Sequence, residues 1–323
     1  MKAIRIAQNG GPEVMQLAEV ETPSPGPHEV RIRTEAIGVN FIDTYHRSGL
    51  YPVKLPSGLG GEAAGVVDAI GANVTRFKIG DRVGTGTAPL GAYAEALIAP
   101  EDKVVRLPDA IAFDVAAASM LKGMTARYLL RKTFPVQRGQ FVVIHAAAGG
   151  VGQIAVQWAK HLGAIVIGVV GSDMKAEIAH ELGAHHVIVM SRENIAERVH
   201  ALTDGEGAHV VYDGVGKDTW DASLDSLRPL GMMVSFGNAS GAPPPFNPLT
   251  LSQKGSLFLT RPTLFHYTRT AALLDETAED LFETLASGAV KIGAPTRYKL
   301  ADAAQAHRDL EARKTTGSLV LIP

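Results

Sequence analysis

The chain of 323 residues contains no cysteine. This absence excludes disulfides, thiolate nucleophiles, iron–sulfur clusters and every zinc site that is built on cysteine. An excess of one charge is also lacking: 31 Lys and Arg face 33 Asp and Glu, a net charge of −2. There is therefore no electrostatic case for a nucleic-acid partner or an anionic membrane.

Two further features are missing. No apolar run is long enough to cross a bilayer, and residues 1–6 alternate like a strand where a signal peptide would have an apolar core. We therefore expect a cytoplasmic protein that does not bind membranes. The composition, 46% hydrophobic and 20% charged, is that of a folded globular chain, and the length predicts about two domains.

Residues 1–122 are rich in Gly and Pro and predict many short strands. Residues 30–34 alternate as a half-buried strand does, residues 63–70 form a longer apolar run, and Gly80-Asp81 marks a turn into another strand. This pattern is typical of a barrel-like or sandwich-like β domain.

The pattern changes after residue 122, where apolar runs alternate with segments of helical length. Residues 151–162 carry one apolar helical face before Gly163, and residues 174–182 are again helical before Gly183. Repeated βα units predict an α/β fold with a doubly wound parallel sheet. A helix near 270–287 and a last strand at 318–322 are expected to follow. The expected strands of the parallel sheet are residues 141–145, 165–170, 187–189, 209–212, 232–236 and 256–260.

A turn of very small residues links the first of these strands to its helix. The spacing Ala147, Gly149, Gly152 is that of a dinucleotide-binding turn. Glycine lets the backbone approach a pyrophosphate, Gly152 lets the helix pack against the strand, and the first helical N–H groups face the anion. Because a strand precedes the turn and a helix follows it, we expect a bound dinucleotide here; a tight turn without a ligand is the alternative.

The tip of the next strand indicates which dinucleotide binds. A site that prefers NADH usually has Asp or Glu there for the ribose 2′-hydroxyl. Here Gly171 leaves room for a 2′-phosphate, Ser172 can donate to it and Lys175 can neutralise it. These residues favour NADPH. A small change of register would instead make Asp173 a ribose acceptor, and Lys175 would then be an ordinary solvated lysine.

These segments resemble the zinc-independent quinone oxidoreductase (zeta-crystallin-like) family of the medium-chain dehydrogenase/reductase superfamily. The likeness covers nearly the whole chain in the right order, and it is closest to the bacterial NADPH:quinone reductase branch. The segments that carry it are residues 145–160, Gly10-Gly-Pro-Glu-Val14, residues 37–52, residues 65–71 and 78–83, Leu121-Lys-Gly-Met-Thr125, Ser235-Phe-Gly-Asn238 and Thr260-Arg-Pro262.

The resemblance implies a GroES-like catalytic domain of residues 1–122 and 266–323, and a Rossmann domain of residues 123–265 that binds NADPH. It also implies an interdomain cleft in which small quinones are reduced, and a homodimer. An NADPH-dependent reductase of activated alkenes is the nearest alternative. A protein that mainly binds NADPH or RNA is a third, although the charge balance disfavours RNA.

Zinc-dependent relatives hold their metal with cysteine and histidine. In this chain Val39-Asn40 stand where the first cysteine would be, and Gly61, before Glu62, stands where the histidine would be. There is no room for a structural zinc lobe between Val83 and Gly91, and we expect no metal. Quinones are already electron-poor, so their reduction needs no metal to stabilise an alkoxide.

The resemblance also suggests which residues act. Candidate catalytic residues are Asn40 near the nicotinamide, Tyr45 and Tyr51 as stacking groups or proton donors, and Arg261 as a directional donor. Each has a plainer alternative, namely a turn asparagine, packing aromatics and a surface ion pair. The candidate cofactor-binding residues are Asn40, Thr125, Ala148, Gly149, Gly150, Val151, Gly171, Ser172, Lys175, Met190, Phe236, Gly237, Asn238, Thr260, Arg261, Pro262 and Arg313.

Two positions depart from the family pattern. Met190 stands where the family often has a tyrosine near the adenine, so a stacking contact would be replaced by softer packing, with Arg192 as a possible compensation. Gly214 stands where close relatives carry serine. Both departures concern how tightly the cofactor is held.

Overall fold

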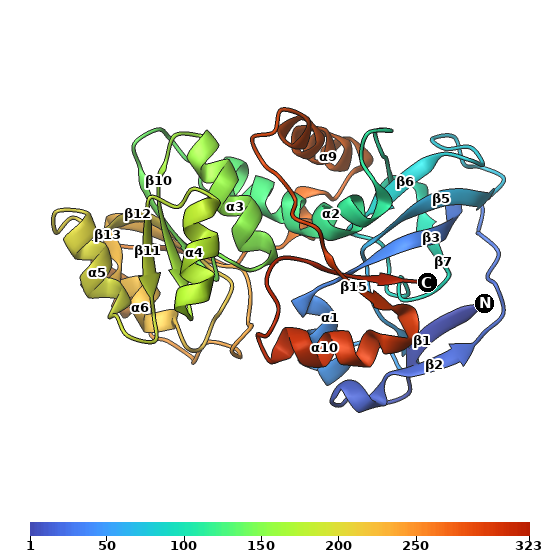
Figure 1. Cartoon of the computed structure of the whole chain (residues 1–323), viewed down its shortest axis with the longest axis horizontal. Helices are drawn as coiled ribbons and strands as arrows, with labels where there is room; N and C mark the ends of the chain where they lie inside the picture. The colour runs from blue at the N-terminus through green and yellow to red at the C-terminus, as the bar shows by residue number, and fades with distance from the viewer. The chain divides into compact units, whose positions relative to one another are not determined.

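The structure is a computed structural model that describes all residues, 1–323. Its contacts divide the chain into two units (Figure 1). The first is Met1–Met124 with Thr268–Phe282 and Ile292–Pro323, and the second is Thr125–Tyr267 with Glu283–Lys291. Residues 283–291 belong to the second unit in part because Gln157 exchanges two hydrogen bonds, of 3.1 and 3.0 Å, with the backbone of Lys291.

The first unit contains two mostly antiparallel sheets. The smaller sheet has the order β2-β1-β4, and the larger has the order β15-β16-β3-β5-β6-β8, with β7 also paired to β3. The strands are β1 (Lys2–Ile6), β2 (Gln16–Glu19), β3 (Glu29–Val39), β4 (Ser57–Gly58), β5 (Ala63–Ile70), β6 (Arg82–Thr85), β7 (Ala96–Pro100), β8 (Val105–Arg106), β15 (Thr296–Lys299) and β16 (Leu319–Ile322).

The long strand β3 is the centre of this unit because it pairs with β16, β5 and β7. Its inward side chains Ile32 and Ile37 are fully buried, together with Val67 of β5. The prediction of a β-rich domain with short strands is confirmed here, and the predicted run 63–70 is strand β5.

Helices of the first unit were not predicted between residues 1 and 122. Alpha-helix α2 is buried on nearly every side: Ala116, Ala117 and Met120 are fully buried, and even its charged residues Lys122 and Arg127 are buried. It therefore shows no helical stripe in the sequence. The helices that begin in this unit are η1 (Pro12–Val14), α1 (Phe41–Ser48), η2 (Glu101–Lys103), α2 (Phe113–Tyr128), α9 (Ala271–Ala286), η4 (Leu300–Asp302) and α10 (Ala303–Glu311).

The second unit is a doubly wound α/β fold, as predicted. Its six strands are all parallel and have the order β11-β10-β9-β12-β13-β14. The strands are β9 (Phe141–His145), β10 (Ile165–Val170), β11 (His186–Val189), β12 (Ala208–Asp213), β13 (Leu227–Ser235) and β14 (Phe258–Thr260).

Helices cover both faces of this sheet: α3 and α4 lie on one side, and α5 and α6 lie on the other (Figure 1). The chain reverses direction along the sheet between β9 and β12, which is where doubly wound folds bind ligands. The helices are η3 (Leu129–Thr133), α3 (Gly150–His161), α4 (Asp173–Glu181), α5 (Ile195–Leu202), α6 (Trp220–Asp225), α7 (Leu249–Gln253) and α8 (Leu264–Tyr267).

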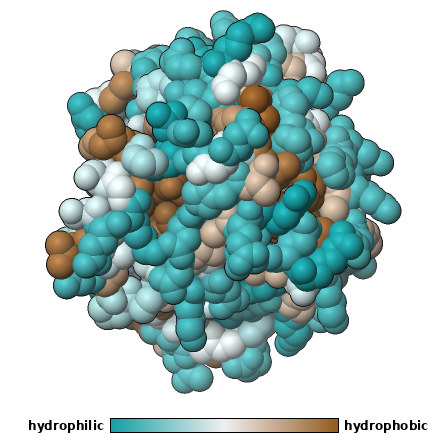
Figure 2. Space-filling model, turned by 90° about the vertical axis from the view of Figure 1, so that its left-hand side faces the viewer, coloured by the Kyte–Doolittle hydropathy of each residue, from teal (hydrophilic) through white to brown (hydrophobic).

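None of the helices is both long enough and apolar enough to pass through a lipid bilayer. Figure 2 shows one face of the molecule, on which hydrophilic groups dominate and apolar groups are scattered among them. Large apolar side chains exposed one by one are ordinary on a protein surface and indicate no site by themselves.

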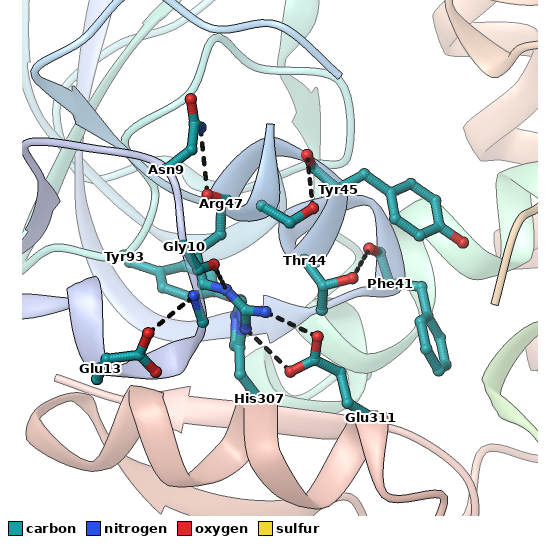
Figure 3. A network of polar contacts seen from close by, with 12 residues as sticks. Asn9, Gly10, Glu13, Phe41, Thr44, Tyr45, Arg47, Tyr93, His307 and Glu311 are labelled. Carbon is teal, nitrogen blue, oxygen red and sulfur yellow. Dashed lines mark hydrogen bonds and ion pairs between the residues drawn. The ribbon is translucent and has the colours of Figure 1, made fainter. Parts of the chain in front are cut away.

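A polar chain that is buried except at Glu311 ties α1 to α10 (Figure 3). The Arg47 guanidinium donates to His307 Nδ1 at 2.9 Å and to both carboxylate oxygens of Glu311 at 3.0 and 2.7 Å. The Tyr93 hydroxyl lies 3.0 Å from His307 Nε2 and donates to Asp43 Oδ2 at 2.8 Å. The arrangement fits a neutral His307 that carries its proton on Nε2 and accepts from Arg47 through Nδ1.

Burial shifts the pKa values of His307 and Asp43, two members of this hydrogen-bonded network, in opposite directions. Burial, followed by the nearby Arg47 charge, lowers the pKa of His307 to about 3. Burial raises the pKa of Asp43 to about 7 despite hydrogen bonds from Asn40 and Tyr93 that oppose the change. The stabilising contribution of a neutral His307 is therefore complete above about pH 6.5 and is lost as the pH falls toward 3, whereas that of a protonated Asp43 is lost as the pH rises through about 7.

We expect His307→Gln to remove the His307 contribution from the acid side of the stability profile and to leave the opposing contribution of Asp43. Between pH 6 and 4 the wild type should lose up to about 1.4 kcal/mol of unfolding free energy per pH unit through His307, because the unfolded chain binds a proton there that the folded chain refuses. Urea unfolding at pH 4, 5, 6 and 7 measures this slope. The exposed His28→Gln serves as control, and equal slopes in wild type and His307→Gln would contradict the assignment.

Candidate functional site

The turn between β9 and α3 is tightly constrained. Ala146 has a positive φ of 50°, which costs energy for a residue with a side chain. A Cβ on Gly152 would lie 2.1 Å from the Ala146 carbonyl oxygen and 2.8 Å from Ala147 Cα, so only glycine lets the helix lie this close to the strand. The predicted role of Gly152 in packing is therefore confirmed by the geometry.

Two helix N-termini without a side-chain cap begin at neighbouring strand ends. Helix α3 starts after Gly149 and helix α4 starts after Ser172, and neither N-cap makes a side-chain capping bond. Strands β9 and β10 are paired up to His145 and Val169, so both helices begin at the same edge of the sheet. Uncapped N–H groups and the helix dipole make this edge suited to phosphate groups.

Space and charge at the tip of β10 fit a phosphate. A Cβ on Gly171 would meet no atom within 4 Å, which leaves open space beside the backbone. Lys175 lies in the first turn of α4. Asp173, which would otherwise compete as a ribose acceptor, forms an exposed ion pair of 2.8 Å with Arg192. Since exposed pairs are weak, Arg192 can exchange this partner for a phosphate at little cost.

Residue Met190 follows β11 directly and lies at the same edge. Its N–H donates to the Val170 carbonyl at 2.9 Å, and its side chain packs partly buried against the apolar core of this unit. This position fits a contact with an adenine ring through soft packing.

A buried carboxylate that the sequence did not indicate organises the next loop. Asp213 Oδ1 accepts the N–H groups of Val215 and Gly216 at 2.7 and 3.0 Å, and Oδ2 accepts the hydroxyls of Thr219 and Ser223, both at 2.7 Å. Ser223 also lies 2.9 Å from Nε2 of the buried His145 at the end of β9.

The pKa of His145 is lowered by burial, which keeps the ring neutral. Asp213 thus fixes the backbone at the carboxyl end of β12. The only indication of this role in the sequence was that an acidic residue ends an apolar strand.

Glycine at position 214 has a structural reason. A Cβ there would lie 2.9–3.0 Å from the Phe236 ring, and a Cβ on Gly237 would lie 2.4 Å from the Gly214 carbonyl oxygen. The Phe236 ring fills the space that a side chain at position 214 would need. Strand β13 ends at Ser235, one residue earlier than predicted, and the Phe236 N–H donates to the Asp213 carbonyl at 2.8 Å.

Asn238 and Arg261 come together at the ends of β13 and β14. When the Asn238 carboxamide is oriented to satisfy both of its ends, it donates to the Gly237 carbonyl at 2.8 Å and accepts from Arg261 Nη2 at 3.3 Å. Thr260 is the last residue of β14, and Pro262 follows Arg261. Nearby, the rings of Tyr128 and Tyr267 stack 4.5 Å apart, and burial raises the pKa of Tyr128 while Arg261 opposes the shift.

The first unit holds three of the predicted catalytic residues around α1. Asn40 is the N-cap of this helix, and its N–H donates to Asp43 Oδ2 at 2.8 Å. Tyr45 and Tyr51 contact each other edge to face at 5.2 Å, across a turn that the left-handed Gly49 makes possible. Figure 3 shows the Tyr45 ring pointing away from the polar chain of Arg47 and Glu311.

The remaining candidates occupy different places. Thr125 is a nearly buried residue of α2 in the second unit. Arg313 lies in the first unit, just beyond α10, with a positive φ of 56°. The roles that the sequence suggested for these two residues stay predictions. Sequence reasoning also missed a role for Glu62, a fully buried acid that directly follows Gly61, the position of the histidine in zinc-dependent relatives.

Nowhere in residues 1–323 do three or more His, Asp or Glu side chains gather in a way that could hold a metal ion.

Comparison with known proteins agrees with the fold described above. Residues 26–109 match the alcohol dehydrogenase GroES-like domain, and residues 150–286 match the zinc-binding dehydrogenase family. The quinone oxidoreductase of Pseudomonas aeruginosa is 54% identical over 323 residues, covering 100% of this chain and 99% of that protein.

Two further relatives are informative. A crystal structure of Escherichia coli quinone oxidoreductase complexed with NADPH superposes with a TM-score of 0.98 at 49% identity, covering 100% of both chains. The 2-haloacrylate reductase of a Burkholderia species is 46% identical and covers 98% of each chain.

Proposed function

Because this chain belongs to the quinone oxidoreductase family of medium-chain dehydrogenase/reductases, we propose that it reduces small quinones with electrons from NADPH. The observation that carries the proposal is the edge of the parallel sheet where α3 and α4 both begin without a side-chain cap. This edge offers N–H groups and two positive helix ends to a dinucleotide that carries three phosphate groups.

The cofactor roles follow from the elements that hold each residue. We assign the pyrophosphate to the turn of Ala148–Val151, and the 2′-phosphate to Gly171, Ser172 and Lys175 with Arg192 as a second cation. Met190 is assigned to the adenine. The NADPH-bound relative from E. coli supports the choice of dinucleotide. When bound, NADPH supplies the reducing electrons.

The reacting end is assigned to residues that offer directional polar groups. Arg261 presents a guanidinium at the end of β14, in contact with the Asn238 carboxamide. Phe236, Gly237, Thr260 and Pro262 line the same strand ends. Asn40, Tyr45 and Tyr51 are assigned to the nicotinamide and the quinone, and Thr125 and Arg313 are retained as cofactor contacts. Positioning of this kind is what the protein contributes when the cofactor carries the chemistry.

Turnover with two acceptors tests the proposal. Purified protein with NADPH should reduce 1,4-benzoquinone faster than a simple enone or 2-chloroacrylate. The 2-haloacrylate reductase among the relatives makes an activated alkene the specific rival. If the protein turns over the alkene faster than the quinone, the proposed activity is wrong and alkene reduction takes its place. That reaction needs an additional proton transfer to carbon.

We also propose that the reaction needs no metal. The expected result is that dialysis against EDTA, followed by assay with benzoquinone in metal-free buffer, changes kcat by less than about twofold. This follows because a quinone accepts electrons without Lewis-acid activation. Metal analysis of the dialysed protein confirms removal. Loss of turnover that added Zn²⁺ restores would contradict this.

The remaining proposals concern association. Family likeness suggests a homodimer, which light scattering tests directly. The near-neutral charge suggests no RNA binding, which filter binding at low and moderate salt tests. Cytoplasmic location stays a proposal of the same kind.

A further inference from the structure

Glu62 is a carboxylate with no solvent exposure, and the partners of its side chain are Asn40, the N-cap of α1, and Leu121 and Lys122 of α2. Its Oε1 accepts the Leu121 N–H at 2.7 Å. Its Oε2 accepts the Asn40 carboxamide Nδ2–H at 2.7 Å and the Lys122 ammonium at 3.2 Å. The Lys122 side chain is only 7% exposed, so this is a buried ion pair of the first unit.

The strand next to Glu62 is shaped to make room for this carboxylate. A Cβ on Gly38 of β3 would lie 2.0 Å from Glu62 Oε2 and 2.5 Å from the Ala117 carbonyl oxygen. The Gly38 N–H also donates to the Glu62 carbonyl at 3.0 Å. A glycine within a strand is destabilising unless close approach requires it. At Gly38, the next-to-last residue of β3, the Glu62 carboxylate and the Ala117 carbonyl require it.

Asn40 is consequently held from two sides by acidic side chains. Asp43 accepts its backbone N–H at 2.8 Å, and Glu62 accepts its carboxamide N–H at 2.7 Å. A carboxylate only accepts hydrogen bonds, so rotating the carboxamide by half a turn would place oxygen against oxygen. Glu62 therefore determines which end of the Asn40 carboxamide is offered to a ligand.

We propose that Glu62 is a positioning residue that acts through Asn40, and that Lys122 balances its charge. Stability alone gives a poor reason for such a pair, because buried ion pairs are often no more stabilising than apolar residues of similar volume. The inference rests on the proposed function only through the role of Asn40 beside the nicotinamide.

The variant Glu62→Gln tests the proposal with little change in shape. Leu121 N–H and Asn40 Nδ2–H donate to different oxygens of Glu62. Glutamine replaces one of these oxygens by an NH2 group, which faces one of the two donors with another donor. We expect kcat to fall about 10-fold while the Kd for NADPH changes less than about threefold, because a misplaced group affects the reacting geometry more than cofactor affinity.

A double-mutant cycle separates positioning from mere stability. Asn40→Ala should lower kcat about as much as Glu62→Gln, and Glu62→Gln should add no further loss in the Asn40→Ala background. Equal losses in both backgrounds, or an unchanged kcat in either single variant, would overturn the proposal. Asp68→Asn, which breaks the 2.8 Å ion pair of β5 with Arg31, is the matched control and should leave kcat unchanged.

A second variant keeps the proposal testable if Glu62→Gln fails to fold, and a spectroscopic measurement tests the contact directly. If Glu62→Gln does not fold, Glu62→Gln with Lys122→Met removes the unpaired ammonium and enters the same cycle. In cofactor-free protein, the Asn40 side-chain amide proton, identified by its loss in Asn40→Ala, should move upfield in Glu62→Gln; an unmoved signal would overturn the proposed contact. The cycle uses whichever acceptor the wild type reduces, so failure of quinone reduction is distinguishable from failure of this proposal.

Discussion

We expect Lys175→Ala to weaken NADPH binding by about 10- to 100-fold while NADH binding changes less than about twofold. Lys175 lies in the first turn of α4, beside the open space at Gly171. A hydrogen bond to a charged group contributes about 1.5–3 kcal/mol, which corresponds to that range of affinity. Only NADPH carries the 2′-phosphate, so the loss should be selective. Titration of cofactor fluorescence measures both dissociation constants.

The matched control for this experiment is Lys160→Ala. Lys160 is an exposed lysine of the same unit but lies in the last turn of α3, at the opposite end of that helix from the turn at Gly149. It should leave both affinities unchanged. Arg192→Ala should give a smaller selective loss than Lys175→Ala, since Arg192 is shared with Asp173. An unchanged NADPH preference in Lys175→Ala would refute the assigned role of this lysine.

The second large effect is expected for Gly152→Ala. The new Cβ would collide with the backbone of Ala146 and Ala147, at 2.1 and 2.8 Å, so α3 must move away from β9. Overpacking of this kind costs about 1–3 kcal/mol of unfolding free energy. Because the displaced helix carries the first-turn N–H groups with it, turnover at limiting NADPH should fall about 100-fold.

Gly171→Ala is the contrasting variant for the same experiment. Its Cβ would meet nothing in the protein, and Gly171 has no positive φ. The folded protein should therefore be as stable as the wild type or up to about 1 kcal/mol more stable. NADPH affinity should nevertheless fall, because the Cβ occupies the space assigned to the 2′-phosphate. Urea unfolding and cofactor titration on both variants decide the question: equal stability of Gly152→Ala and wild type would contradict the packing argument.

Hydrophobic periodicity predicted the strands of the second unit well because the causes of this pattern are local in the sequence. Strands buried on both faces appear as continuous apolar runs, and the predicted runs 141–145 and 165–170 are strands β9 and β10 without a shift at either end. The glycine-rich turn, with a strand before it and a helix after it, predicted a phosphate site. The structure adds that α3 at this turn and α4 at the tip of β10 both begin without a side-chain cap. The resemblance to zinc-independent quinone oxidoreductases is likewise confirmed by the full-length relatives.

The first unit was less predictable because helices α1 and α2 lack local signals, whereas α9 agrees with the helix predicted near 270–287. Helix α2 is buried all around, so no polar face marks its period. Helix α1 is short, and its orientation is set by Arg47 reaching His307 and Glu311, more than 250 residues away in the chain. Contacts between residues so far apart in the chain produce no sequence motif from which they could be predicted.

The sequence by itself determined the fold class, the dinucleotide turn and the absence of cysteine-based metal ligands. These properties depend on residue types and on spacings within about one strand and one helix. Only the tertiary structure decided that Glu62 and Lys122 pair around Asn40, that Asp213 organises the loop after β12, and that Arg192 neutralises Asp173. The physical reason is that a buried charge is tolerated only where distant segments bring it partners, and the partners are known only once the chain has folded.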